Sequence, residues 1–244
     1  MSKIRPLLQL LIAILPCLSA AAVTLDEVNA GALRLYQARL AESEQRQELD
    51  GDQKFLRRVQ GIAGKLIAQA EHERGAEAAI VWEIHTSGAP DESASCMAGG
   101  KLLIGQAYVE QLELNDAELA MLIAHEMEHA LLQHNLKEMR EALRLEPERL
   151  QRPFSELEYA VDHDNTLMNK LDAFNAAQEL EADHDGFLLA WRAGWPAAGL
   201  ANYYKKAAHA DTMANFDRRE HPASARRWQA IQTLSKQIGN QGSR

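Results

Sequence analysis

The sequence has little cysteine and no excess of basic charge. Of its 2 cysteines, Cys17 falls in a leader-like segment, which leaves Cys96 alone in the rest of the chain. Pro16 stands before Cys17, where a lipoprotein signal would have a small residue, so lipidation is not expected. A lone cysteine forms no intramolecular disulfide, so the fold must depend on its core and on any metal that it binds. The 26 Lys and Arg residues against 35 Asp and Glu residues, a net charge of −9, argue against nucleic-acid binding.

The amino terminus lacks a hydrophobic run of comfortable membrane-spanning length. Its apolar stretch, residues 7–15, is too short for that purpose. Lys3 and Arg5 precede this stretch, and the small residues 20–22 follow it. This is the pattern of a cleaved signal peptide over residues 1–22, with an uncleaved anchor as the alternative.

Periodicity along the rest of the chain predicts a single helix-dominated α+β domain over residues 23–244. Helices come first, within 24–74, then short β-type segments, then more helices, an order typical of this class. The charged segment after the expected helix 116–143 contains Pro147 and Pro153 and is expected to form a loop or short helices. The expected helices are 25–49, 52–73, 116–143, 165–193, 197–209 and one from Ala223; the expected β-segments are 78–86 and two pieces around Gly99 and Gly100, in a hairpin or a kinked edge strand.

One expected helix carries the sequence A-H-E-M-E-H-A-L-L-Q-H, in which titratable residues interrupt an apolar run. Asn115, with Glu118 three positions later, matches a capping box that would start this helix. Positions four apart share a helix face, so His125 and His129 can direct two imidazole nitrogens at one point. Two such nitrogens suit zinc. Glu126 lies beside them and is expected to take a proton from a metal-activated water.

A third protein ligand is expected from the helix that reads A-A-Q-E-L-E-A-D-H-D-G-F. A catalytic zinc takes three protein ligands and keeps one position open. Glu179 and Asp183 are four residues apart and share a face, so Glu179 is the expected ligand. Asp183 is expected to bond His125 and fix its tautomer, as carboxylates commonly do for metal-binding histidines. Glu181 points to another face and is expected to be solvated.

Together the two motifs resemble those of gluzincin peptidases of the HtpX and CAAX prenyl protease type, which include periplasmic proteases of the BepA and LoiP type. H-E-M-E-H and the downstream E-L-E-A-D match the patterns H-E-x-x-H and E-x-x-A-D. The stretches L-N-D-A-E-L-A-M-L-I-A and G-G-K-L-L-I are similar to the family's lead-in and edge strand. The resemblance covers roughly residues 75–232, which are therefore expected to form the catalytic core.

The resemblance implies roles for residues outside the two motifs. Gly100, Leu102 and Ile104 would lie on the edge strand that borders the active-site cleft and pairs with an extended substrate. H-P-A-S-A-R-R is similar to the family's H-P-x-x-x-x-R segment. His221 would then lie near the metal and act on the transition-state oxyanion or cap the metal at rest, and Arg227 would support it.

The function that this resemblance implies is hydrolysis of peptide bonds by an endopeptidase with one zinc ion per chain. Its substrates would be unfolded or misassembled envelope proteins in the periplasm, and it would associate with outer-membrane assembly components. Two alternatives stay open: a zinc-stabilised chaperone or binding module with little or self-inhibited proteolysis, and a narrow aminopeptidase.

Overall fold

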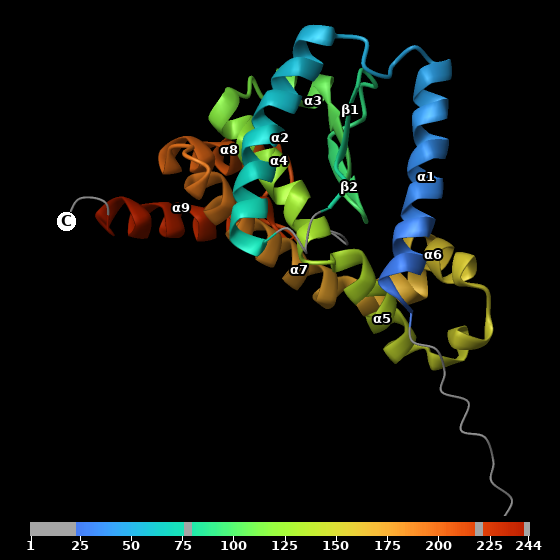
Figure 1. Ribbon diagram of the computed structural model, residues 1–244. Coiled ribbons are helices and arrows are strands. Elements are labelled where there is room, and N and C mark those ends of the chain that lie inside the picture. Colours follow the sequence, from blue (N-terminus) through green and yellow to red (C-terminus); the bar gives the residue numbers. More distant parts are fainter. Residues whose placement is uncertain (1–22, 76–79, 218–221, 242–244) are drawn as a thin grey trace, which may run out of the picture.

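The computed structural model describes residues 23–75, 80–217 and 222–241 (Figure 1). Helices dominate these residues and surround a small sheet, so the α+β, helix-dominated class is confirmed. In chain order the elements are α1 (Leu25–Gln45), α2 (Gln53–Arg74), β1 (Glu83–Ser87), β2 (Ala94–Met97), β3 (Lys101–Gly105), α3 (Gln106–Gln111), α4 (Asp116–Leu131), α5 (His134–Leu145), the short 3-10 helix η2 (Pro147–Gln151), α6 (Phe154–His163), α7 (Asn165–Arg192), α8 (Ala197–Ala210) and α9 (Ser224–Gln241).

The sheet has the strand order β1-β3-β2, with β1 parallel and β2 antiparallel to β3. The expected hairpin is confirmed, and Gly99 and Gly100 both have φ of +76° in its turn, a conformation that favours glycine. The expectation of an edge strand containing Leu102 and Ile104 is wrong. These two residues are fully buried and belong to the central strand β3, which is paired on both sides. The edge nearer the pocket described below is β2.

The expected long helix through residue 143 is also wrong, because it is two helices. The capping box at its start is confirmed: Asn115 accepts hydrogen bonds from the N–H groups of Ala117 and Glu118, and Glu118 accepts one from Asn115. The helix α4 ends at Leu131, and Gln133 takes a left-handed conformation with φ of 56°. The chain then starts α5 in a new direction, a break for which no glycine or proline gives a local signal.

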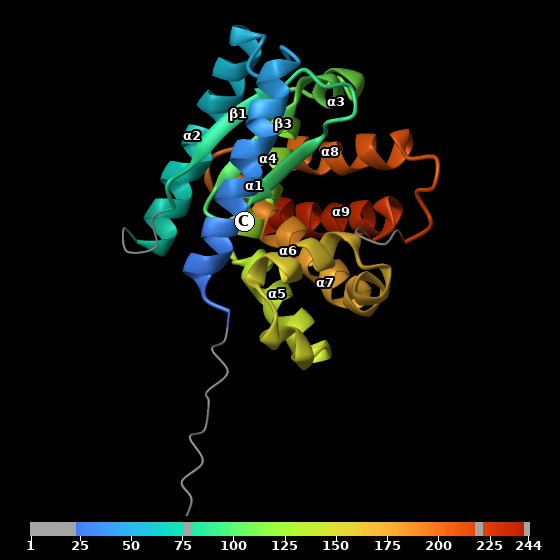
Figure 2. The ribbon, with the colours of Figure 1, turned by 90° about the vertical axis from the view of Figure 1, so that its right-hand side faces the viewer.

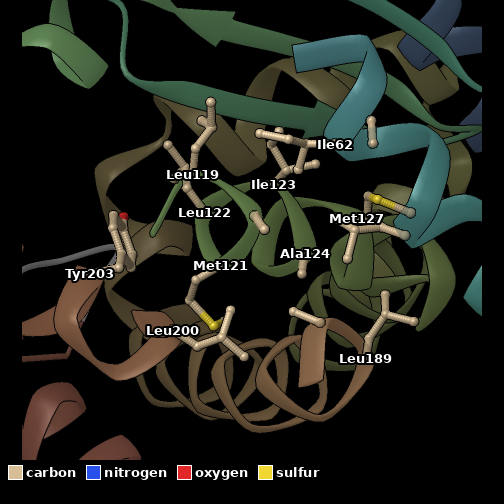
Figure 3. Close-up of a cluster of buried hydrophobic side chains, with 14 of the residues drawn as sticks. Ile62, Leu119, Met121, Leu122, Ile123, Ala124, Met127, Leu189, Leu200 and Tyr203 are labelled. Atoms are coloured by element: carbon tan, nitrogen blue, oxygen red, sulfur yellow. The ribbon is translucent and has the colours of Figure 1, made fainter. Parts of the chain in front are cut away.

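Helix α4 is the centre of the main hydrophobic core. Figure 3 shows its apolar side chains directed toward several neighbours, among them Ile62 of α2, Leu189 of α7 and Leu200 of α8. A helix that is apolar on all sides must be buried. Its approach to α7 is especially close, since a Cβ on Gly186 would lie 2.9 Å from the backbone nitrogen of His125. The core therefore fixes the position of α4 against α7, the two helices that carry the motifs.

Helix α1 lies on the other face of the sheet from α2 and α4 (Figure 2). Tyr36 of α1 is fully buried and donates a hydrogen bond of 3.0 Å to the carbonyl of Leu102 in β3. A second hydrophobic cluster joins α1 to α5, α6 and the first half of α7. Among the described helices, none has the length and apolar character needed to cross a membrane.

Candidate metal centre and active site

Three side chains from α4 and α7 converge on one point. The Nε2 atoms of His125 and His129 lie 3.3 Å apart. Glu179 reaches both rings, with its Oε1 3.2 Å from His129 Nε2 and its Oε2 3.5 Å from His125 Nε2. These three residues are the group that could hold a metal ion within the described part of the chain.

The spacing of these atoms fits a tetrahedral ion. Zinc bonds of 2.0–2.1 Å at tetrahedral angles place neighbouring ligand atoms about 3.3 Å apart, which matches the 3.3 Å between the two Nε2 atoms. The two Glu179 distances involve different oxygens, and one ligand atom from each of the three residues lies within 4.8 Å of the others. Two imidazole nitrogens and one carboxylate oxygen are also a donor set typical of catalytic zinc. The Glu179 residue is only 6% exposed, and a buried carboxylate requires a nearby cation. We therefore take His125, His129 and Glu179 as the residues that would hold the metal.

The other nitrogen of His125 faces Asp183, with Nδ1 and Oδ1 3.0 Å apart. Asp183 also accepts a hydrogen bond of 2.6 Å from the Tyr204 hydroxyl and two from Arg227, of 2.8 and 2.6 Å. Burial alone would raise the pKa of Asp183, but the Arg227 charge and these bonds outweigh it and lower the pKa to about 2. Asp183 is thus held as a carboxylate beside His125.

The two buried carboxylates create a strong demand for positive charge at His125. Burial alone would lower the pKa of this histidine, but the Glu179 charge and the contact with Asp183 outweigh burial and raise the pKa to about 10. The site therefore favours a positive charge at this point. A metal ion bound to the ring nitrogens would balance the two carboxylate charges, as a proton on His125 does.

Arg227 lies at the centre of this acidic group. Its Nη1 is 3.4 Å from Glu179 Oε2, besides the pair with Asp183, and its guanidinium lies 5.6 Å from the Tyr204 ring. The sequence suggested Arg227 as a support for His221, which lies outside the described residues. The contacts observed here are instead with the acidic residues of α7, although Pro222, next to His221, lines the adjoining pocket.

A pocket of about 440 Å³ opens beside His125, which is one of the three converging side chains and lines its wall. Glu126 lies on its wall next to His125, so the expected base faces open space. Tyr108 of α3 and Tyr203 of α8 also line it, with their hydroxyl oxygens 3.3 Å apart. Sequence reasoning missed both tyrosines because neither belongs to a spaced motif; their relation to α4 exists only in the folded chain.

The pocket is bordered by Ser93 and by Ala94 of β2. The Ser93 carbonyl accepts a hydrogen bond of 2.6 Å from Gly105, which makes these two residues a hydrogen-bonded pair. Hydrogen-bonded and non-hydrogen-bonded residue pairs alternate along an antiparallel ladder, so Ala94 and Cys96 are in non-hydrogen-bonded pairs with β3. Their N–H and C=O groups therefore point away from β3. The open edge of the sheet thus belongs to residues 94 and 96 and not to the strand that contains Leu102 and Ile104.

Glu181 also departs from the expectation of a purely solvated side chain. Its side chain is 45% exposed, yet one oxygen lies 3.2 Å from His134 Nε2. His134 in turn contacts His129.

The chain is distantly similar to a known protein. No family model matches the chain. A mitochondrial metalloendopeptidase, OMA1 from Arabidopsis thaliana, is 26% identical to it over 155 residues. The chain is similar to a metalloendopeptidase. The match covers 64% of this chain and 31% of the relative, so the chain spans about a third of that protein's length. This similarity and the cluster of His125, His129 and Glu179 support a metallopeptidase with a zincin-like α+β fold.

Proposed function

We propose that the protein is a zinc-dependent endopeptidase of the gluzincin type, resembling HtpX and the periplasmic BepA and LoiP proteases. The observation that carries this proposal is the convergence of His125, His129 and Glu179 at metal-ligand spacing, with Glu126 on the wall of the adjoining pocket. The distant similarity to a metalloendopeptidase agrees with it.

The reaction that these residues support is hydrolysis of a peptide bond. A zinc ion bound there would polarise the scissile carbonyl and acidify a water molecule. Glu126 removes a proton from the attacking water and returns it to the leaving amine nitrogen. Asp183 holds His125 in the tautomer with its proton on Nδ1, which leaves Nε2 free as a ligand. His221 stays a proposed stabiliser of the oxyanion, with its neighbour Pro222 on the pocket wall.

We expect the substrate to pair with β2 as an added strand. The backbone groups of Ala94 and Cys96 face away from β3, and Ala94 borders the pocket beside Glu126. Only every second residue of an extended peptide can bond such an edge. N-methylation of a cleaved peptide, one position at a time, should therefore slow cleavage strongly at alternating positions near the scissile bond. A flat response along the peptide would reject this binding mode.

Digestion of an unfolded protein tests the proposal. Reduced casein incubated with zinc-loaded protein from Val23 onward should give internal cuts, identified by mass spectrometry. A chelator should abolish them and added zinc should restore them, because the metal would both polarise the scissile carbonyl and acidify the attacking water. Cuts confined to a terminus would indicate an aminopeptidase. Casein binding without cuts, by protein shown to contain zinc, would indicate the chaperone or binding module.

The proposed place of action is the periplasm, after removal of residues 1–22. Val23, the first described residue, is buried in the second hydrophobic cluster, and its carbonyl accepts hydrogen bonds from Arg140. This docking makes Val23 part of the folded domain, and cleavage just before it belongs to the proposal. Sequencing the amino terminus of exported protein tests the cleavage site. Misassembled envelope proteins and outer-membrane assembly components are the proposed partners, and cross-linking in intact cells should recover them.

A further inference from the structure

We propose that His134 and Glu181 form a hydrogen-bonded relay that orients the metal ligand His129 and fixes its tautomer. Both are positioning residues, since they act through His129 and not on the substrate. The inference rests on the proposed metal site.

The contacts form a continuous chain from α4 through α5 to α7. His134 Nδ1 lies 3.0 Å from His129 Nδ1, and its Nε2 lies 3.2 Å from Glu181 Oε2. The two imidazole rings meet edge to face, with centroids 4.9 Å apart. The His134 residue is only 3% exposed, so water cannot readily replace these partners. Lys137 Nζ, 3.4 Å from the same Glu181 oxygen, holds the outer end of the chain.

The direction of each hydrogen bond follows from the role of His129. If its Nε2 binds a metal, its proton must be on Nδ1, because a neutral imidazole carries only one. His134 Nδ1 must then accept that proton's hydrogen bond, so the proton of His134 is on Nε2. That N–H points at Glu181, a carboxylate that can only accept. Every group in the relay is satisfied in this one arrangement, and it leaves His129 Nε2 free for the metal.

The break between α4 and α5 is what makes the contact. On a continuous helix, residues five positions apart point about 140° away from each other, so His134 would face away from His129. The left-handed Gln133 lies between the two helices and sets His134 at the start of α5, with its ring in contact with that of His129. A left-handed, non-glycine residue at this position is consistent with a functional need for the contact between His134 and His129.

Helix α7 thus supports both metal-binding histidines. Asp183 bonds His125 directly, whereas Glu181 reaches His129 through His134. Outer partners of this kind commonly change metal affinity by about 10–100-fold when they are removed.

Two nearly isosteric substitutions separate this role from simple packing. The Oδ1 of asparagine can take the place of the His134 Nδ1 acceptor. Leucine has nearly the same shape as asparagine but carries no acceptor. Zinc affinity, measured by competition with a chromophoric chelator, should fall about 10–100-fold in His134→Leu. It should stay within about threefold of the wild-type value in His134→Asn, since the acceptor for His129 remains. Glu181→Ala, at a half-exposed position, should weaken zinc binding by less than His134→Leu does.

The outcomes distinguish the relay from the metal site itself. Equal affinities for His134→Leu and His134→Asn would show that only packing matters and would overturn the relay. Unchanged affinity in Glu181→Ala would remove Glu181 from it. Wild-type protein that binds no zinc would instead contradict the proposed function. Circular dichroism and urea unfolding of the chelated variants confirm that the compared proteins are folded.

Discussion

Replacing Glu126 by glutamine is expected to abolish proteolysis while leaving zinc in place. Glu126 lies on the pocket wall beside His125, but it is not one of the three residues whose atoms converge on the metal position. Glutamine has nearly the same shape and cannot accept the proton of an attacking water. Loss of a general base and acid lowers the rate by about 10²–10⁴-fold, so kcat/KM of Glu126→Gln should fall at least that far.

The measurement pairs cleavage of a quenched fluorescent peptide with the zinc content of each protein. Glu110→Gln, the same change at an exposed position on α3, is the matched control and should retain wild-type activity and zinc. A zinc-loaded Glu126→Gln protein that cuts at the wild-type rate would remove Glu126 from the mechanism. Loss of both zinc and activity would mean that Glu126 acts on the metal site and not as the base.

The second large effect is expected from Arg227→Met, on stability. The Arg227 guanidinium is the cation that pairs with Asp183 and lies beside Glu179, and both carboxylates are buried. Removing one partner of a buried ion pair leaves an uncompensated charge, at a cost of about 3–5 kcal/mol in the free energy of unfolding. Urea unfolding of chelated protein at neutral pH measures this loss, since bound zinc would otherwise stabilise the folded state by mass action.

The pH dependence of this loss has a definite sign. Arg227 holds the pKa of Asp183 at about 2, below its unfolded value, so the stabilisation is present at neutral pH and is lost on acidification. Without Arg227, only the contacts with His125 and Tyr204 oppose burial, so the pKa of Asp183 rises and acid neutralises this carboxylate sooner in the variant. The stability gap between the wild type and Arg227→Met should therefore shrink as the pH falls toward 2. A gap independent of pH would attribute the loss to packing.

Arg226→Met provides the control for this experiment. Arg226 is adjacent in the same helix and exposed, so its substitution should change the free energy of unfolding by less than about 0.5 kcal/mol. A similar loss in both variants would point to helix α9 as a whole and not to the ion pairs of Arg227.

Much of the candidate site follows from spacing within single helices. His125 and His129, and likewise Glu179 and Asp183, are four residues apart, and that interval places two side chains on one face whatever surrounds the helix. The start of α4 is equally local, because the capping box of Asn115 and Glu118 involves only the first turn. Local rules of this kind can be applied to a sequence before any fold is known.

The remaining features depend on contacts between segments far apart in the chain. The order β1-β3-β2 puts Ala94 and Cys96 of β2, and not Leu102 and Ile104 of β3, at an edge of the sheet, since strand pairing is a tertiary choice that composition does not encode.

The turn at Gln133 and the placement of Arg227 have the same origin. Gln133 has no intrinsic preference for a left-handed conformation, so the packing of α5 against α7 must hold it there. Arg227 is far in sequence from Asp183 and finds it only when α9 packs on α7. Residue types and intervals thus determined which chemistry the chain carries, whereas the packing of separate helices and strands decided which groups support it and where a substrate can lie.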